Sequence, residues 1–432
     1  MPEPIAPPTR VASLDALRGL TIFLMVVVND VAKTADGPLW LQHMPPGVDG
    51  MTFADVVFPA FLFVAGMSVP LSGGAMRARG LSTSSILRKI LWRTSGLLIM
   101  GTFMVGRADN TGMSANLWTG LMYVCFFLTW SVLPKEPSRR RQAFLVGRAL
   151  GVAGLVALAI VYRGPEGERL VLGPLFEAGG DAWVRHEWWG ILGIIGWSYL
   201  ISSLAYLGGA RREALLGLTA LFVLIYLAEE ATPSTVLQAR TWLEPLSPTF
   251  AVWRAVHVWL QSHLGLGHVV GVPTALSLAG AALGTCLRPS QNVRAEDRIR
   301  LAVFMAIGLG IAAMLLDPLH GISKPASTPS WGLWSAAITC AGWAFTYWLM
   351  DVRGVRGWAR FLRPAGENPL TAYILHPLVR GALVLVPFLD VLRFYKREGV
   401  GPVVSTVGAL AMTGLIVWLT GVLAKRGVRL KV

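Results

Sequence analysis

The stretch SLDALRGLTIFLMVVVND, residues 13–30, combines a long apolar run with charged residues near both of its ends. It is typical of the whole chain, in which 54% of the 432 residues are hydrophobic, 14% are charged, and mean hydropathy is +0.57. A soluble domain carries about 25% charged residues. The chain therefore has too little polar surface for a water-exposed protein, and we predict an all-α, polytopic membrane helix bundle.

Apolar segments of about 17–25 residues, the length that a helix needs to cross a bilayer, recur along the chain. We expect about twelve transmembrane helices in a single domain, residues 1–432, after a short cytoplasmic segment at 1–16. We also expect residues 249–264 to form a helix that lies in the outer interface. The expected spans are residues 17–31, 53–72, 90–106, 116–133, 143–162, 188–207, 214–228, 268–287, 301–317, 332–350, 369–388 and 402–424.

The charge pattern gives the expected orientation. Net charge is +14, and an alternating layout with both termini in the cytoplasm puts 26 of the 38 Lys and Arg residues on the inner side. This bias is the one that orients membrane proteins. We therefore assign the cations to topology in a bacterial inner membrane, with the lipid bilayer as partner and no nucleic acid. The layout leaves a homodimer open. The cysteines, at 125, 286 and 340, lack metal-ligand spacing, so we expect no metal.

Polar residues mark both ends of the first span. Asp15 and Arg18 are three residues apart, so they share a helix face and can pair. That pair is either a topology anchor or part of a site for an anionic ligand. At the other end, Asn29 is either a helix terminator or an amide donor for a developing oxyanion.

His43 and Asp55 flank the start of the second span, which begins in MTFADVVFP, residues 51–59. A carboxylate in the first turn of a helix is favoured by the helix dipole, so Asp55 can be a cap. A carboxylate beside an imidazole can also orient it for general-base chemistry. Both interpretations of Asp55 stay open, and a lone histidine in a loop can be incidental.

Two further clusters are candidates for substrate binding. Lys324 lies in a Pro/Gly-rich outer loop ahead of Trp331, on the side that has few cations, and would suit an anionic or hydroxyl-rich substrate. Asn368 precedes a span in which His376 and Arg380 share one face with Tyr373. Ionisable groups inside a span rarely face lipid, so we expect this face to line a pocket or a path.

Several blocks together resemble the bacterial branch of the heparan-α-glucosaminide N-acetyltransferase family. They are SLDALRGLTIFLMVVVND, MTFADVVFPAFLFVAGMSV, HEWWGILGIIGWSYLI, ISKPASTPSWGLW and GENPLTAYILHPLV, and they spread over nearly the whole chain. The resemblance implies a polytopic enzyme that takes acetyl groups from cytosolic acetyl-CoA and transfers them to an amino sugar or glycan across the membrane.

The resemblance also assigns roles to particular residues. His43, the histidine of the loop between the first two blocks, matches the family's key histidine, and Asn29 matches the asparagine that closes the first span. His43 would act as a base or a transient acyl carrier, with Asp55 beside it. The phosphates of the acetyl-CoA cosubstrate would bind inner cations, and we expect a passage between these cations and His43. The expected cofactor-binding residues are Asp15, Arg18, Arg88, Lys89 and Arg93.

The chain departs from the family pattern at two places. Val48 and Asp49 replace a Trp-Asn pair, and residues 116–125 lack the arginine that family members often carry there. The acceptor therefore stays open. The alternative function is a transporter or flippase of a small or lipid-linked substrate, because twelve spans with both ends inside are a common transporter layout.

Overall fold

The computed structural model describes residues 11–32, 34–105, 112–134, 137–163, 186–229, 267–288, 291, 293–385 and 387–431. The expected interfacial helix at 249–264 lies outside these residues. Within them the chain is helical apart from loops and one isolated bridge between Ser131 and Leu430. The all-α prediction is confirmed for the described part of the chain.

A helix occupies each of the twelve segments that the sequence predicts to be apolar spans. The long helices are α1 (Ala12–Val31), α2 (Phe53–Ala78), α3 (Thr83–Val105), α4 (Ala115–Trp130), α5 (Arg139–Val161), α7 (His186–Leu207), α8 (Arg212–Glu229), α10 (Val272–Gly284), α11 (Ala295–His320), α12 (Pro329–Tyr347), α14 (Pro369–Leu385) and α15 (Gly401–Lys425). Short elements join them: η1 (Leu39–Leu41), η7 (Gly357–Leu362), α13 (Arg363–Glu367) and η8 (Pro387–Lys396).

Six helical segments of the described chain are long and apolar enough to cross a membrane. They lie at Ala12–Val31, Phe53–Ala78, Arg139–Val161, Gly190–Leu207, Ala295–His320 and Gly401–Lys425. Helix α3 is as long as α5, but Arg88, Lys89 and Arg93 occupy its first half and lower its hydropathy. The count of twelve spans and the cytoplasmic termini therefore stay predictions.

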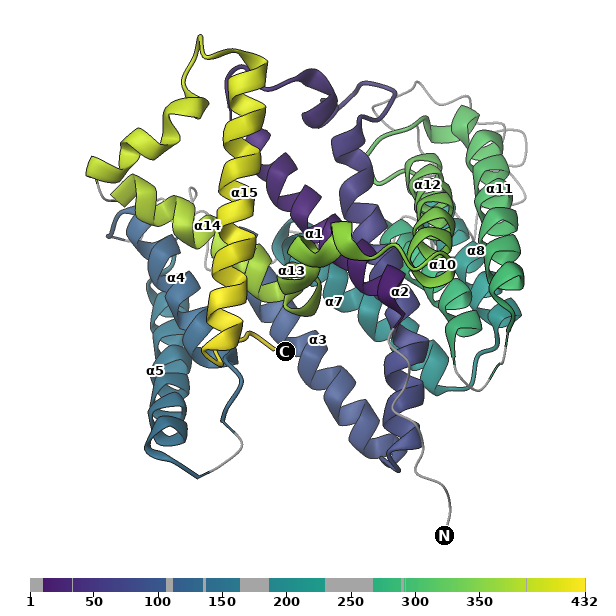
Figure 1. Cartoon of the computed structure of the whole chain (residues 1–432), viewed down its shortest axis with the longest axis horizontal. Coiled ribbons are helices and arrows are strands. Elements are labelled where there is room, and N and C mark those ends of the chain that lie inside the picture. Colours follow the sequence, from purple (N-terminus) through teal and green to yellow (C-terminus); the bar gives the residue numbers. More distant parts are fainter. Residues whose placement is uncertain are drawn as a thin grey trace.

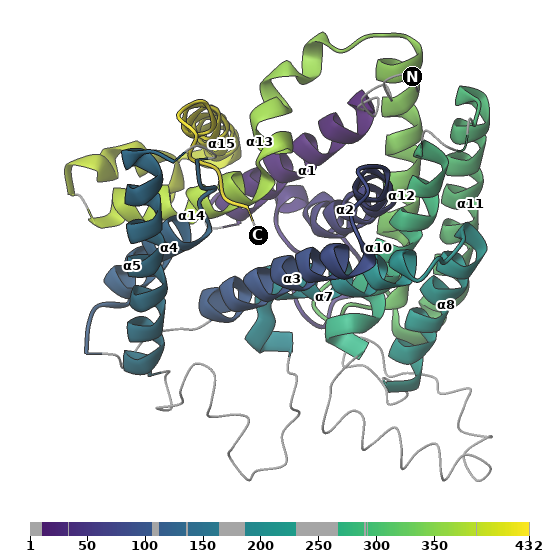
Figure 2. The ribbon, with the colours of Figure 1, turned by 90° about the horizontal axis from the view of Figure 1, so that it is seen from below.

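The helices form two groups on either side of α1 and α13 (Figures 1 and 2). One group holds α4, α5, α14 and α15, and the other holds α2, α8, α10, α11 and α12. Helices α3 and α7 pack side by side beneath α1, as Figure 2 shows from below. Elements that are far apart in the sequence therefore meet at α1, the helix of the opening stretch.

Helix α10 forms the centre of the second group and is buried along its whole length. It packs on α2 through Gly66 and Gly280. A Cβ at either glycine would lie 2.0 Å from a backbone carbonyl oxygen of the facing helix, that of Ser277 or Phe63. Small residues at helix crossings let backbones approach closely in membrane proteins. This contact fixes α2, whose first turn carries Asp55.

Helix α13 packs on α1 in the same way. A Cβ at Gly19 would lie 2.6 Å from the carbonyl oxygen of Leu362, and one at Gly366 would lie 2.6 Å from that of Asp15. We call the side of the bundle that holds the last turn of α1 and the first turn of α2 the His43 end. The opposite side, where α1 meets α13, is the Arg18 end.

Candidate active site

A histidine–aspartate pair lies at the start of α2. His43 Nδ1 is 2.8 Å from Asp55 Oδ1, and the two residues come from the loop before α2 and from its first turn. The Asp55 side chain is 0% exposed and that of His43 is 35% exposed. The pair therefore has a buried carboxylate and an imidazole that opens toward the His43 end.

The local sequence holds the Asp55 carboxylate in place. Its Oδ2 atom accepts hydrogen bonds from the backbone N–H of Met44, at 3.1 Å, and of Thr52, at 3.0 Å. Thr52 is the N-cap of α2, and its Oγ1 donates to the carbonyl oxygen of Gln42 at 2.7 Å. One oxygen of Asp55 thus belongs to the helix cap and the other contacts His43. The cap is confirmed, and the role of Asp55 in general-base chemistry stays a prediction.

Lys324, in the loop between α11 and α12, completes the cluster. Its Nζ lies 2.9 Å from Nδ1 and 3.0 Å from Nε2 of His43, and 3.8 Å from Asp55 Oδ1. If Nδ1 donates its proton to Asp55, then Nε2 carries the free lone pair and faces Lys324. The arrangement is a carboxylate, an imidazole and an ammonium in one chain of contacts.

Burial lowers the pKa of Lys324 to about 8, although the Asp55 carboxylate acts in the opposite direction. The ammonium is therefore charged at neutral pH but loses its proton more readily than an exposed lysine. A cation of this kind can stabilise negative charge that develops near His43.

The loop that carries Lys324 is tied down by its own side chains and by the His43 loop. Thr328 Oγ1 accepts the N–H of Ser323 at 2.9 Å, which closes the loop on itself. Asp49 Oδ1 accepts the N–H of Ile322 at 2.7 Å, and the N–H of Gly50 donates to the Ile322 carbonyl at 2.8 Å. Asp49, one of the two departures from the family pattern, therefore joins the two halves of the site.

Trp331 contacts the backbone of Asp55. It is 1% exposed, and its Nε1 donates to the Asp55 carbonyl oxygen at 2.9 Å. The structure thus brings together four of the residues that the sequence predicts, namely His43, Asp55, Lys324 and Trp331. Contact of Trp331 with a substrate stays a prediction.

A second carboxylate centre lies at the end of α1. Asp30 Oδ1 is 3.2 Å from His376 Nε2 and 2.5 Å from Lys396 Nζ, and Tyr395 Oη donates to Asp30 Oδ2 at 2.6 Å. The Lys396 ammonium also donates to the Asp30 carbonyl oxygen at 3.0 Å. The side chain of Asp30 is 1% exposed, and those of His376 and Lys396 are each 8% exposed. This centre is closed, and it joins α1, α14 and η8.

Burial lowers the pKa of Lys396, and Arg380 and Arg393 lower it further, while Asp30 raises it. Burial also raises the pKa of Tyr395, as does its hydrogen bond to Asp30. The sequence patterns did not indicate that Tyr395 and Lys396 contact Asp30. The available signal was that Lys396, like Lys324, lies on the side that the charge pattern leaves poor in cations.

The remaining predicted residues lie apart from the His43 cluster. Asn29 is half-buried beside Asp30, and no hydrogen bond joins its amide to another residue in the described part of the chain. Asn368 is buried between α13 and α14, where its Nδ2 donates to the Pro364 carbonyl at 3.2 Å. Arg380 is half-buried on α14. These three residues keep their predicted roles as untested expectations.

The expected donor-binding residues lie at the Arg18 end. Arg18 Nη2 is 3.1 Å from Asp15 Oδ1, which confirms the predicted ion pair, and its Nη1 donates to the Gly366 carbonyl. The side chains of Arg88, Lys89 and Arg93 are exposed on α3, and the Arg93 guanidinium lies 4.6 Å from the Tyr199 ring centre. The expected passage from these cations to His43 stays a prediction.

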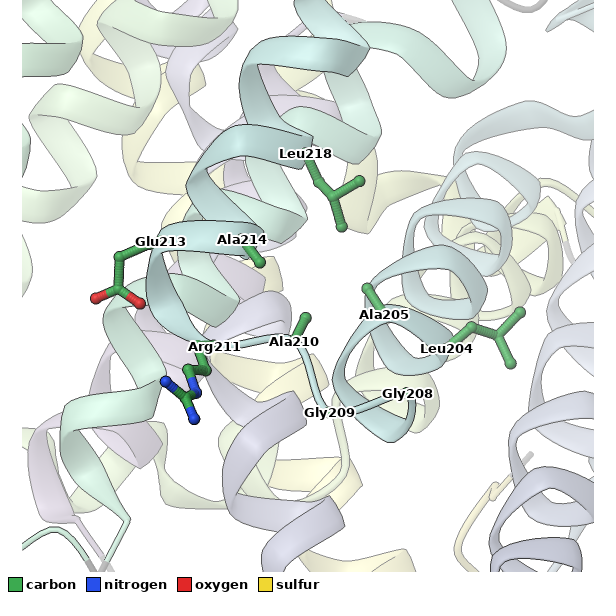
Figure 3. Close-up of a pocket in the computed structure, with 9 residues that line it drawn as sticks. All are labelled: Leu204, Ala205, Gly208, Gly209, Ala210, Arg211, Glu213, Ala214 and Leu218. Atoms are coloured by element: carbon green, nitrogen blue, oxygen red, sulfur yellow. The ribbon is translucent and has the colours of Figure 1, made fainter.

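An open surface pocket of about 510 Å³ lies elsewhere, between the end of α7 and the start of α8 (Figure 3). Its lining is mostly apolar, with Arg211 and Glu213 at one edge. None of the predicted site residues lines it. Among the described residues no group of three His, Cys, Asp or Glu side chains could hold a metal ion.

A family model covers the part of the chain that holds His43 and Asp55, and curated proteins resemble part of the chain. A family described as a domain of unknown function (DUF5009) matches residues 10–170. The human heparan-α-glucosaminide N-acetyltransferase is 39% identical over 99 residues, which cover 23% of this chain and 14% of the human protein. The resemblance to the heparan-α-glucosaminide N-acetyltransferases is confirmed.

The mouse heparan-α-glucosaminide N-acetyltransferase is 38% identical over 97 residues, which cover 22% of this chain and 14% of the mouse protein. The confirmed resemblance thus extends over less than a quarter of the chain. It spans 14% of the length of each curated relative.

Proposed function

We propose that this chain is a membrane acetyltransferase that moves an acetyl group from cytosolic acetyl-CoA to an amino sugar or glycan at the His43 end. The observation that carries the proposal is the contact of His43 with Asp55 and Lys324, in a chain of which 23% aligns with a known acetyltransferase. The helices long enough to cross a bilayer support a multi-pass membrane protein.

The His43–Asp55 pair has the geometry of a general base. Asp55 Oδ1 accepts the Nδ1 proton, which fixes the ring. The Nε2 lone pair faces the Lys324 ammonium at 3.0 Å, and it can take the proton of an acceptor amine that displaces this ammonium. Because Asp55 Oδ2 is occupied by backbone donors, the carboxylate cannot rotate away from the ring. A base in such a position contributes about 10²–10⁴-fold to the rate.

Lys324 is the nearest group that can stabilise an oxyanion. Attack on the thioester carbonyl turns its oxygen into an anion, and the ammonium next to Nε2 would donate to that oxygen. Asn29 is the second expected donor. An oxyanion donor contributes about 10²–10³-fold.

Two routes agree with this arrangement. In direct transfer the amine forms the new N–C bond, the C–S bond breaks, and His43 passes the amine proton to the departing thiolate. In the covalent route Nε2 first takes the acetyl group and releases CoA, and the amine then attacks the acetyl-imidazole. Both routes balance with CoA and the acetylated amine as products.

The cosubstrate would bind at the Arg18 end. Arginine is a natural partner for phosphate because its planar fork donates two parallel hydrogen bonds. Arg18 is partly held by Asp15, whereas Arg88, Lys89 and Arg93 are exposed and would receive the CoA phosphates. Asn368, Arg380 and the loop at Lys324 are the proposed acceptor contacts.

The test is a thiol-release assay. Membranes that contain the full chain receive acetyl-CoA and glucosamine, and free CoA is measured. We expect release that depends on the amino sugar and falls at least about a hundredfold in His43→Ala. Arg300→Gln, which removes an exposed cation on α11, is the control and should retain the rate.

The same membranes test the transporter alternative. Uptake of the amino sugar without CoA release, unchanged in His43→Ala, would favour a transporter and contradict the enzyme. The half-buried Arg380 on α14 favours the transporter alternative, because an ionisable group within a membrane span commonly lines a substrate or ion pathway.

A further inference from the structure

Four arginines from different elements lie around the end of α10, which continues into the short element η4 (Thr285–Leu287). They come from α2, from α8, from α11 and from the residue that follows η4. We define the arginine cluster as Arg77, Arg212, Arg288 and Arg298. Arg77 belongs to the last turn of α2 and Asp55 to its first, so the cluster lies at the opposite end of α2 from the candidate active site.

Two neutral residues connect three of these arginines. Arg212 Nε donates to Thr285 Oγ1 at 3.2 Å, and Arg288 Nε donates to the Thr285 carbonyl oxygen at 3.4 Å. Arg288 Nη1 also donates to Tyr206 Oη at 3.4 Å. The guanidinium carbons of Arg77 and Arg288 lie 5.7 and 5.9 Å from the centre of the Tyr206 ring. The three cations therefore surround Thr285 and Tyr206, which are both buried.

Arg298 adds a fourth cation from α11. Arg298 and Arg212 both act electrostatically on Cys286, so both guanidiniums lie near η4. Arg298 Nη1 donates to Tyr347 Oη at 2.9 Å, whereas its Nε is buried and has no hydrogen-bond partner within the described residues. A buried donor without an acceptor is costly. Arg212, Arg288 and Arg298 are half-buried, whereas a cation that only orients a bundle can stay in solvent.

No carboxylate forms an ion pair with the arginine cluster in the part of the chain that the structure describes. Glu213 and Glu296 are close in sequence, but both are exposed and neither pairs with a described residue. Asp297 pairs with Arg300, which lies outside the cluster. The C-terminal end of a helix carries about half a negative charge, so the end of α10 offsets only a fraction of the four positive charges.

We propose that the arginine cluster binds a phosphate group at the end of α10. A guanidinium can donate two parallel hydrogen bonds to phosphate oxygens, and several of them suit an anion with several oxygens. The Tyr206 hydroxyl accepts from Arg288 and keeps its own proton for a further phosphate oxygen. The phosphate can belong to a lipid headgroup or to a soluble phosphate ester. The site does not depend on the proposed acetyl transfer.

Thermal unfolding of the full chain tests the site in two arms. In the first, nanodiscs of phosphatidylcholine are compared with nanodiscs that also contain phosphatidic acid. In the second, delipidated protein in a neutral detergent is titrated with inorganic phosphate at constant ionic strength. We expect the melting temperature to rise in at least one arm, and Arg288→Gln to lose most of that rise. A rise with phosphatidic acid alone identifies a lipid headgroup, and a rise with inorganic phosphate identifies a soluble ligand.

Arg79→Gln is the matched control, because it removes an exposed cation two residues after Arg77 and should keep the response. A wild-type chain that responds in neither arm would overturn the proposal. An Arg288→Gln chain that responds like wild type, or an equal loss in Arg79→Gln, would overturn it as well.

Should Arg288→Gln fail to fold, Arg288→Lys replaces it in the same two arms. This variant keeps the charge but loses the planar fork of the guanidinium. The half-saturating concentration of the phosphate ligand should therefore rise about tenfold. An unchanged value would contradict the site.

Discussion

The two carboxylate centres at the His43 end contain the same kinds of side chain but differ in how far their histidines are exposed. Each has an aspartate at a helix terminus, a histidine and a lysine. His43 is 35% exposed, whereas His376 is 8% exposed and shares its aspartate with a tyrosine and a lysine. We propose that the imidazole that opens toward solvent meets a substrate and that the enclosed one holds helices together. Exposure, more than residue type, distinguishes the site from the scaffold.

Asp55→Asn gives the largest expected effect on activity. The amide keeps the shape but no longer accepts the Nδ1 proton as a carboxylate does, so the ring loses its orienting charge. We expect CoA release to fall by about 10²–10⁴-fold. Thermal unfolding of the same preparation should show a modest loss of stability, because the amide oxygen can still accept the backbone N–H groups of the cap. A rate within threefold of wild type would show that Asp55 is a helix cap only.

Asp30→Ala gives the largest expected effect on stability. It leaves Lys396 buried without its counter-ion and removes the partner of Tyr395 and His376. Breaking a buried pair in this way costs about 3–5 kcal/mol. Thermal unfolding measures the loss, and Asp297→Ala is the control, since its exposed pair with Arg300 is worth at most about 1 kcal/mol. Equal losses in the two variants would contradict a structural role for the closed centre.

The pH profile of CoA release in Lys324→Gln tests the role of Lys324 in the His43 centre. Because the pKa of Lys324 is lowered to about 8, its ammonium and any oxyanion contact are lost as pH rises through about 8. The pH profile of CoA release should therefore have an alkaline limb near pH 8 in the wild type. The variant should lack that limb and be about 10²–10³-fold slower at neutral pH.

The lowered pKa of Lys324 should also make the free energy of unfolding depend on pH. Between about pH 8 and the ordinary pKa of lysine, the unfolded chain holds a proton that the folded chain has released, so the free energy of unfolding should rise with pH across this window. Denaturant unfolding at several pH values measures the slope. An equal slope in Lys324→Gln would assign it to another group.

Much of the fold could be predicted from the sequence. Apolar length places a helix at each of the twelve expected segments, because backbone groups in a bilayer must pair within a helix. The Asp15–Arg18 pair follows from helix spacing, and Asp55 follows from the first turn of α2. The number of spans is harder to predict, because α3 carries cations in its first half and apolar residues in its second half.

The contacts between distant segments could not be predicted. Lys396 reaches Asp30 across 366 residues, and Lys324 reaches His43 across 281. Nothing in local periodicity indicates which cation joins which carboxylate, because that depends on how α1, α14 and η8 pack. The structure places the His376 ring against Asp30, a contact that the sequence did not indicate, and the predicted contact of His376 with a substrate stays untested.

Among these variants, Asp49→Ala has the smallest expected effect on stability and on CoA release. The variant loses the hydrogen bond to the Ile322 N–H, which ties the Lys324 loop to the His43 loop. We expect a loss of about 1 kcal/mol and a severalfold slower CoA release, with Asp49→Asn retaining both. Loss in both variants alike would show that the charge of Asp49, and not its hydrogen bond, matters.

The most direct measurement of the difference between the two centres pairs His43→Gln with His376→Gln. For each variant, CoA release per folded molecule and melting temperature are measured on the same preparation. We expect that His43→Gln loses release at an unchanged melting temperature, and that His376→Gln lowers the melting temperature while folded molecules keep their rate. The opposite pattern, with catalysis lost in His376→Gln and retained in His43→Gln, would contradict the assignment of chemistry to the open centre.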